Sequence, residues 1–188
     1  MGRPKSYDRT EVLDRAMRLF WRKGYEGTHL SELVEITGLN RFSLYNEFGG
    51  KEGLYGAALE HYVSGLGDLL AILEREPLGL ANIRAFHRAQ LVDEFQEGCF
   101  ALNTVREKSV VPPSAWSTVE GFTRGTRERL LANLRAAARA GELPAGRDPE
   151  ALAATLAAFD MGLLSLRTLG VSPPQALRLV EEIERLLE

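Results

Sequence analysis

Apolar residues recur every three or four positions along nearly the whole chain, which is the spacing of a helix that buries one face. No stretch alternates strictly between apolar and polar residues, and no Asn-Gly or Asp-Gly pair is present to close a two-residue hairpin. The pattern therefore predicts an all-α fold of about nine helices. With 188 residues, the chain is long enough to bury a core in one or two domains.

Caps and helix breakers set the boundaries of the expected helices. Asp8 and Glu11 predict a capping box ahead of the first helix, and Thr28 and Asn40 are expected to cap the second and third. Glycines and prolines separate the later segments. The expected helices cover residues 9–23, 29–37, 41–48, 51–73, 78–95, 99–107, 114–140, 149–169 and 173–187.

The second and third expected helices are short and close together in the sequence. They meet through Thr37-Gly38-Leu39-Asn40, where the glycine supplies the tight corner of a helix-turn-helix connection. In the third helix we expect Leu44, Tyr45 and Phe48 to point inward. This arrangement predicts a helix-turn-helix unit near the N-terminus.

Glycine, aromatic and apolar residues stand at fixed spacings through this part of the chain. The series consists of Gly24, Tyr25, Thr28, Leu33, Gly38, Ser43, Leu44, Tyr45, Phe48, Lys51 and Leu54. It resembles the DNA-binding domain of the TetR family of bacterial one-component repressors. Looser similarities follow at Gly98-Cys99, Asn103-Thr104 and Gly162-Leu163-Leu164, whereas Phe42 stands where the family more often has a small residue.

The resemblance implies a domain organisation and a function. Residues 1–50 would form a three-helix DNA-binding domain, and residues 51–188 a larger helical domain for effector binding and dimerisation. It further implies a cytoplasmic, homodimeric repressor released from DNA by a small-molecule effector. Its two recognition helices, about 34 Å apart, would read a palindromic double-stranded operator.

The third helix is short enough to lie in a major groove. Arg41 is expected to donate to guanine, Asn46 to pair with adenine, and Phe42 to contact a thymine methyl group or sugar carbons. A solvated surface charge is the alternative for Arg41. Asn40 and Ser43, in the same stretch, are also expected to contact DNA.

Phosphate contacts are expected at helix starts, where backbone amides and the helix dipole favour anions. Thr28, Tyr45 and Lys51 are the expected residues; Thr28 could instead be a plain cap and Tyr45 a core aromatic. In the N-terminal tail, Arg3 and Lys5 are expected to enter a minor groove, unless the tail is an untethered polar terminus.

The net charge of −3 argues at first against nucleic acid, because phosphate binding relies on lysine and arginine. The charge is unevenly distributed, however. Residues 1–52 hold nine basic and eight acidic residues, whereas the rest of the chain holds 14 and 18. DNA binding must therefore depend on where the basic residues are placed. Affinity should also require two DNA-binding domains held at the right spacing, so a monomer should bind poorly.

Two groups of residues are expected to serve the second domain. Polar and aromatic side chains on otherwise apolar helices are candidates to line an effector chamber, with ordinary core or surface roles as the alternative. They are His61, Tyr62, His87, Asn103, Trp116, Phe122, Phe159 and Asp160. Residues spaced by three and four on the last two helices predict antiparallel packing of these helices, and apolar residues beyond that seam, Met161, Leu164, Leu179 and Leu186, predict a partner subunit. The expected dimer interface consists of Leu156, Phe159, Leu163, Leu164, Val180, Ile183 and Leu187.

Other function classes are less well supported. We expect no catalytic residue, metal or cofactor, because nucleotide-binding glycine loops, Gly-x-Ser-x-Gly and His-Glu-x-x-His are missing from the sequence. The single cysteine, Cys99, is expected to be a buried small hydrophobe rather than a redox sensor. The most apolar stretch, Ala151–Leu166, is expected to be too short to span a membrane. A helical scaffold or ligand carrier that does not bind DNA specifically remains an alternative.

Overall fold

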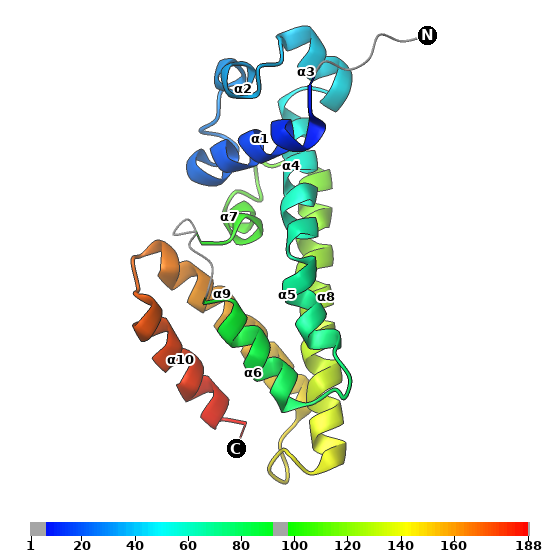
Figure 1. Cartoon of the computed structure of the whole chain (residues 1–188), viewed down its shortest axis with the longest axis vertical. Helices are drawn as coiled ribbons and strands as arrows, with labels where there is room; N and C mark the ends of the chain where they lie inside the picture. The colour runs from blue at the N-terminus through cyan, green and yellow to red at the C-terminus, as the bar shows by residue number, and fades with distance from the viewer. Residues whose placement is uncertain (1–6, 92–97, 188) are drawn as a thin grey trace. The chain divides into compact units, whose positions relative to one another are not determined.

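A computed structural model describes residues 7–91 and 98–187 of the chain (Figure 1). Within those ranges the structure is helical and contains no strand, which confirms the all-α prediction. The helices are α1 (Arg9–Lys23), α2 (Leu30–Thr37), α3 (Arg41–Phe48), α4 (Lys51–Gly65), α5 (Gly67–Ala71), the 3-10 turn η1 (Ile72–Glu74), α6 (Leu80–Ala89), α7 (Phe100–Arg106), α8 (Pro113–Ala140), α9 (Pro149–Thr168) and α10 (Pro173–Arg185).

The chain packs as two compact units. The first consists of the described residues up to Gly65 together with Phe100–Glu120, and the second of the described residues in Leu66–Cys99 and from Gly121 onward. Residues of α4 and α7 therefore belong to the same packed body as α1, α2 and α3. The division into functional domains at residue 50 stays a prediction.

Local caps explain where α1 begins. The Asp8 carboxylate accepts a hydrogen bond from the Thr10 backbone N–H at 2.8 Å, as expected for an N-cap. Glu11 pairs with Arg15 one turn further along instead of closing a capping box. Gly24 ends the helix with a φ of 75° and a ψ of 173°, a positive-φ conformation that favours glycine.

The expected cap of α2 is wrong. The Thr28 hydroxyl donates to the Gly24 carbonyl oxygen at 2.7 Å, and the Thr28 side chain is fully buried. His29 is the N-cap instead, and its backbone N–H donates to the Glu32 carboxylate at 3.0 Å. A threonine ahead of an apolar run is a good local cap, but here packing against the end of α1 takes its hydroxyl.

The long helix expected over residues 51–73 is interrupted. It divides into α4, α5 and the turn η1, with the break at Leu66 between Gly65 and Gly67. Glycine weakens a helix because it loses the most backbone entropy on folding, so a pair of glycines one residue apart favours a break. The helix expected over residues 78–95 is shorter too, since α6 ends at Ala89 and part of that range lies outside the described residues.

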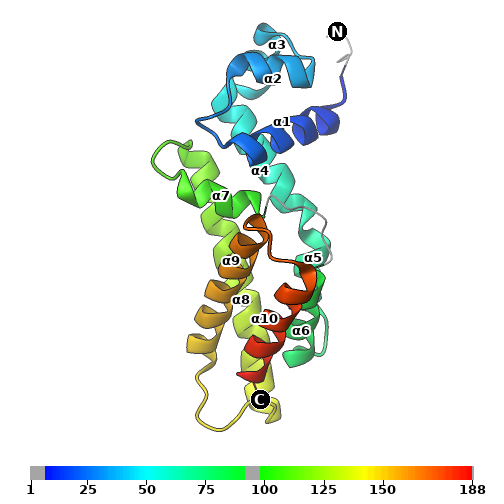
Figure 2. The same cartoon turned by 90° about the vertical axis from the view of Figure 1, so that its left-hand side faces the viewer.

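In the second unit, α10 lies beside α9 and α6 (Figure 2). The main hydrophobic cluster comprises Ile72, Leu73, Leu80, Ile83, Phe86, Leu130, Leu134, Ala137, Ala153, Leu156 and Leu187. A smaller cluster of Leu163, Ala176 and Val180 joins α9 to α10. Cys99 is buried, as expected of a small hydrophobic residue.

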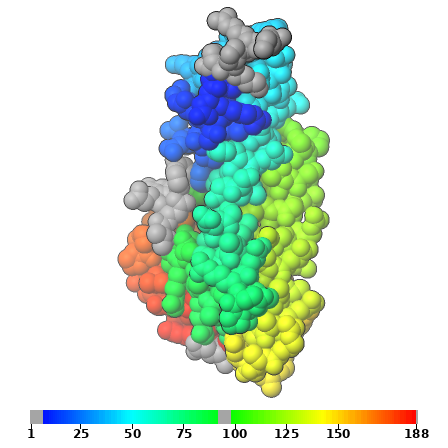
Figure 3. All heavy atoms as spheres, turned by 45° about the vertical axis from the view of Figure 1, so that its right-hand side comes forward, coloured from blue at the N-terminus to red at the C-terminus, as the bar shows by residue number. Residues whose placement is uncertain are grey.

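A buried asparagine ties three elements of this unit together. The Asn133 amide on α8 donates to the Leu73 carbonyl at 2.8 Å, and its side-chain oxygen accepts from the Gly79 N–H and the Asn82 amide, both at 3.0 Å. These bonds hold η1 and the start of α6 against the second half of α8. Figure 3 shows α5 and η1 lying along that part of α8.

The residues expected at a dimer interface pack mostly inside their own chain. Leu156, Leu163, Val180 and Leu187 are buried, and Phe159, Leu164 and Ile183 are partly buried. The expected seam between α9 and α10 forms within the single chain, where α10 also contacts α6, so its buried members are covered without a second copy. Other apolar residues of these helices stay exposed, namely Met161, Leu177, Leu179 and Leu186.

By length and composition, α9 could cross a membrane. The helix, Pro149–Thr168, is 20 residues long and therefore extends beyond the most apolar stretch of the sequence, Ala151–Leu166. Ala153, Leu156 and Leu163 of this helix are buried in the core clusters of the second unit. Core packing therefore accounts for part of its apolar character.

Candidate functional site

The connection between α2 and α3 is a closed helix-turn-helix. Gly38 ends α2 in the left-handed conformation, with φ 72° and ψ 3°. The Thr37 hydroxyl donates to the Leu33 carbonyl at 2.5 Å and accepts from the Leu39 N–H at 3.3 Å. Because Leu33 and Leu39 are both buried, this turn is fixed by its core and by its hydrogen bonds.

The next helix, α3, separates an inner from an outer face. The Asn40 side chain caps it by accepting from the Ser43 N–H at 2.8 Å, as the sequence predicts. Leu44 is fully buried and Phe48 half-buried. Tyr45 does not point inward as its place in the pattern predicts, since 57% of its surface is exposed. Its position one residue after Leu44 turns it out of the core.

Four residues expected to contact DNA lie together on the outer face of α3, which we call the α3 outer face: Arg41, Phe42, Tyr45 and Asn46. All four are exposed, and Phe42 has 81% of its surface accessible. Positions i, i+1, i+4 and i+5 form one continuous side of a helix. This side presents a guanidinium, an amide and two aromatic rings, which are the groups that bases and the DNA backbone accept.

Tyr45 and Lys51 meet where α3 ends and α4 begins. A Cβ atom placed on Gly50 would lie 2.8 Å from Cε1 of Tyr45, so the ring lies against the backbone just before Lys51. The Lys51 ammonium lies 4.4 Å from the centre of the Tyr25 ring. Burial lowers the pKa of Lys51, and the nearby carboxylates of Glu107 and Glu26 oppose that shift. An ammonium and a phenol at a helix start are suited to holding a phosphate.

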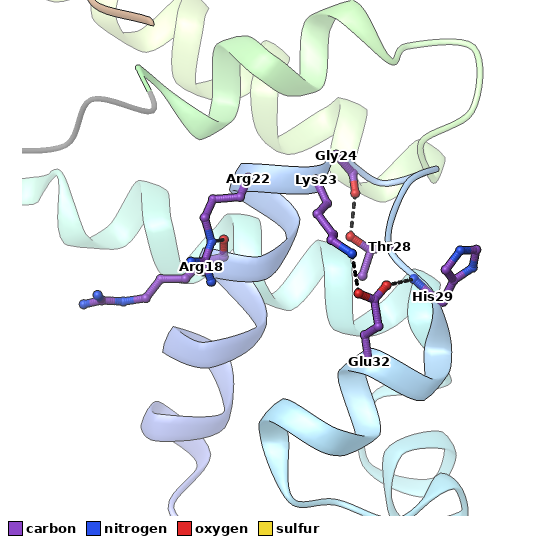
Figure 4. Close-up of polar contacts among 7 residues, drawn as sticks. All are labelled: Arg18, Arg22, Lys23, Gly24, Thr28, His29 and Glu32. Carbon is purple, nitrogen blue, oxygen red and sulfur yellow. Dashed lines mark hydrogen bonds and ion pairs between the residues drawn. The ribbon is translucent and has the colours of Figure 1, made fainter.

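The turn between α1 and α2 is held by side chains shown in Figure 4. Lys23 forms an ion pair with Glu32, whose other oxygen accepts the His29 N–H, and these contacts lower the pKa of Glu32. Beside them the Thr28 hydroxyl donates a hydrogen bond to the Gly24 carbonyl oxygen. Thr28 therefore stabilises this turn from within the core, and its buried side chain is not placed to bind a phosphate.

The remaining expected DNA contacts have mixed outcomes. Arg3 and Lys5 lie outside the described residues. Asn40 uses its side-chain oxygen for the cap, and Ser43 is half-buried beside it. One further contributor, Glu107, has no local sequence signal, because its carboxylate accepts the Tyr25 N–H at 2.8 Å from 82 positions away.

Comparison with known proteins decides the family. Residues 12–58 match the family described as bacterial regulatory proteins, tetR family. Residues 79–181, which are more than half of the chain, match the tetracyclin repressor-like C-terminal domain. The chain belongs to the TetR family of transcriptional regulators.

Individual relatives are similar over parts of their length. The HTH-type transcriptional repressor ComR of Escherichia coli (strain K12) is 55% identical over 62 residues, which are 33% of this chain and 30% of ComR. The regulator YezE of Bacillus subtilis (strain 168) is 39% identical over 103 residues, 54% of this chain and 49% of YezE. The chain thus spans about a third to a half of the length of these curated relatives.

A solved structure matches the whole chain. It is a cysteine mutant of the TetR family transcriptional regulator CifR, complexed with 26-bp double-strand operator DNA. The sequence identity is 30%, the TM-score is 0.79, and the match covers 100% of both chains.

In this TetR-family chain, the residues expected to line an effector chamber divide between the two units. In the first unit, His61 bonds Asp14 at 2.7 Å, and the Tyr62 ring packs edge-on against Trp21. Trp116 lies beneath the Lys108 ammonium. Asn103 on α7 and, in the second unit, Phe122 on α8 are half-buried.

The other three, His87, Phe159 and Asp160, do come together in the second unit. The His87 ring is fully buried, 5.8 Å from the centre of the Phe159 ring, and its Nε2 lies 3.3 Å from Oδ1 of Asp160. The same oxygen accepts from the Gln90 amide at 3.2 Å. Neither His87 nitrogen, nor Oδ2 of Asp160, has a partner with hydrogen-bond geometry among the described residues. Polar atoms buried in this way can bind a ligand or water.

Burial shifts both groups toward their neutral forms. It lowers the pKa of His87 to about 4 and raises that of Asp160 to about 7, the latter opposed by the bond from Gln90. The distance of 3.3 Å would also suit an ion pair, but the lack of hydrogen-bond geometry favours a neutral pair.

Replacing Asp160 with asparagine tests this assignment. Because the folded-state pKa of Asp160 is raised to about 7, the wild type should lose stability as the pH rises from about 4 to about 7 through this group. Asp160→Asn removes that loss, so relative to the wild type it should gain roughly 2–4 kcal/mol over the interval and then level off. Urea denaturation at pH 5, 6, 7 and 8 measures the difference. A constant difference would mean that Asp160 is ionised throughout.

Proposed function

We propose that this chain is a transcriptional repressor that binds a palindromic operator as a homodimer. The observation that carries the proposal is the α3 outer face, where four groups suited to DNA stand exposed on a helix-turn-helix with a closed core. The family membership supports it, as does the likeness to CifR, a regulator solved with operator DNA. Such a regulator would act in the cytoplasm, and we assign no catalytic role to any residue.

Within this proposal the residues have different tasks. Arg41 and Asn46 read base edges in the major groove, and Phe42 presses on a thymine methyl group or on sugar carbons. Tyr45 and Lys51 contact phosphates at the start of α4. The base contacts give specificity, and the phosphate contacts set the register of the protein on DNA.

Two substitutions separate these tasks in a fluorescence anisotropy titration against the promoter DNA that flanks the gene. Arg41→Ala should weaken binding to the operator by about 1–3 kcal/mol and have little effect on a scrambled duplex, because a base contact is lost. Lys51→Gln should weaken binding to both duplexes and lower the slope of log K against log salt by about one per subunit.

Arg139→Ala, an exposed arginine at the end of α8, is the matched control and should leave both affinities unchanged. Equal losses on operator and scrambled DNA for Arg41→Ala would contradict base reading. A wild type that binds the operator no better than random DNA at low salt would favour the alternative, a helical scaffold or ligand carrier.

The dimer would form through the apolar residues that the subunit leaves exposed on α9 and α10. Met161, Leu177, Leu179 and Leu186 are exposed although they are apolar, and they flank the buried seam of the second unit. Exposed apolar surface on a terminal helix pair favours a second copy as its cover.

The effector would be a small molecule that binds in the second unit and favours a conformation with lower operator affinity. His87, Phe159 and Asp160 are its proposed contacts, because they combine unpaired polar atoms with an aromatic ring in a buried place. A ligand changes the equilibrium only by its differential affinity for the two conformations. Native mass spectrometry of the purified full chain tests the proposal: a co-purified mass should be present in the wild type and lost in His87→Phe.

A further inference from the structure

Glu107, which follows α7, holds the turn between α1 and α2 by two hydrogen bonds. One carboxylate oxygen accepts the Tyr25 N–H at 2.8 Å, and the other accepts the Glu26 N–H at 3.2 Å. The contact is close, because a Cβ atom placed on Gly24 would lie only 2.7 Å from Oε1 of Glu107. Two backbone donors at the end of α1 are thus satisfied by one side chain that follows α7.

The position of this carboxylate is fixed by the packing of α7. The Thr104 hydroxyl of α7 bonds the Tyr55 phenol of α4 at 2.8 Å, inside the core. The Phe100 ring, also from α7, packs edge-on against Tyr55 at 5.4 Å between ring centres. Beyond the helix, the Glu107 carbonyl accepts the N–H groups of Val110 and Val111. These contacts of α7 and of the residues that follow it therefore fix the position from which Glu107 bonds to the turn.

The turn that Glu107 holds also supports a proposed DNA contact. The Tyr25 ring, whose backbone N–H is bonded to Glu107, is the ring over which the Lys51 ammonium lies at 4.4 Å. Lys51 is the first residue of α4 and stands next to the backbone covered by Tyr45. A displacement of the turn would thus move the surface on which Lys51 rests.

We propose that Glu107 is a positioning residue for operator binding: its carboxylate holds the α1–α2 turn in the arrangement that suits DNA, and it links the position of α7 to operator affinity. The inference rests on the proposed function. The physical reason is preorganisation, because a turn already held in its bound form loses less entropy on binding. Movement of α7 by any cause would release both N–H groups together and lower operator affinity.

Three variants of the full chain test the proposal. Glu107→Ala removes both acceptors and should weaken operator binding by about tenfold, the size expected for losing charge-assisted hydrogen bonds. Glu107→Gln keeps one acceptor and should have a smaller effect in the same direction. Glu128→Ala, an exposed glutamate on α8, is the matched control and should bind like the wild type.

A double-mutant cycle distinguishes positioning from loss of fold. If Glu107 acts through the support of Lys51, then Lys51→Gln should cost less affinity, and change the salt slope less, in Glu107→Ala than in the wild type. All titrations are run well below the unfolding midpoint of each variant, measured by circular dichroism.

The result that overturns the inference is a wild type that binds its operator while Glu107→Ala binds within twofold of it. Strictly additive losses for Glu107→Ala and Lys51→Gln overturn it as well. A wild type that fails to distinguish operator from scrambled DNA refutes the proposed function instead, so the two failures are separable.

Discussion

Replacing Gly53 with alanine should lower the free energy of unfolding by more than about 3 kcal/mol, and it should abolish operator binding. A Cβ atom at this position would lie 1.5 Å from the Phe48 carbonyl oxygen and 2.8 Å from its carbon. The obstacle is backbone, so no change of rotamer relieves it. The first turn of α4 would have to move away from the end of α3, which carries Tyr45 and positions the α3 outer face. Urea denaturation followed by circular dichroism measures the loss.

The matched control is Gly65→Ala, at the last residue of the same helix. A Cβ atom there meets nothing within 4 Å. Alanine should therefore change stability by no more than about 1 kcal/mol, and in the favourable direction, because it reduces the entropy of the unfolded chain. If both variants were equally stable, the close approach of α4 to Phe48 would be contradicted.

Leu163→Asp and Met161→Asp should affect folding differently, although the two residues are almost adjacent on α9. Leu163 is 2% exposed and packs against Ala176 and Val180, so Leu163→Asp buries an unpaired charge and should cost about 4 kcal/mol or more. Met161 is 40% exposed, and Met161→Asp should leave the subunit folded. Circular dichroism should show lost helix only for the first variant.

The second variant tests the proposed dimer. Sedimentation velocity should find a dimer for the wild type and a monomer for Met161→Asp, since a charge at an apolar interface is left without a partner. The monomer should also bind operator DNA poorly, because only one recognition helix can engage at a time. A dimer that survives both Met161→Asp and Leu179→Asp would place the interface on another surface.

Much of the first unit could be predicted because its signals are local. Asn40 caps α3 as expected, and Gly38 forms the corner that its sequence position indicates, since both effects act within four residues. The errors arose where packing competes with local preference. Thr28 bonds backward to Gly24 instead of capping α2, and Tyr45 faces outward although aromatic residues dominate cores.

The rest depends on contacts between residues far apart in the chain, which periodicity does not encode. Asp160 and Gln90 are 70 residues apart, and nothing in their spacing brings them to His87. Glu107 stands at the end of a short helix without any local pattern that ties it to Tyr25. Similarly, the seam of α9 and α10 was visible as a pattern, but the pattern cannot tell whether the surface covering it belongs to the same subunit.

In the proposed dimer, that seam separates folding from association. Because Leu163 and Val180 are covered within their own chain, a newly made subunit can complete its core before it meets a second copy. Folding would then be unimolecular and association a separate, concentration-dependent step. At low copy number most subunits would be folded monomers. Occupancy of an operator that requires both recognition helices of a dimer would then rise with the square of the subunit concentration. The level of expression would itself tune repression.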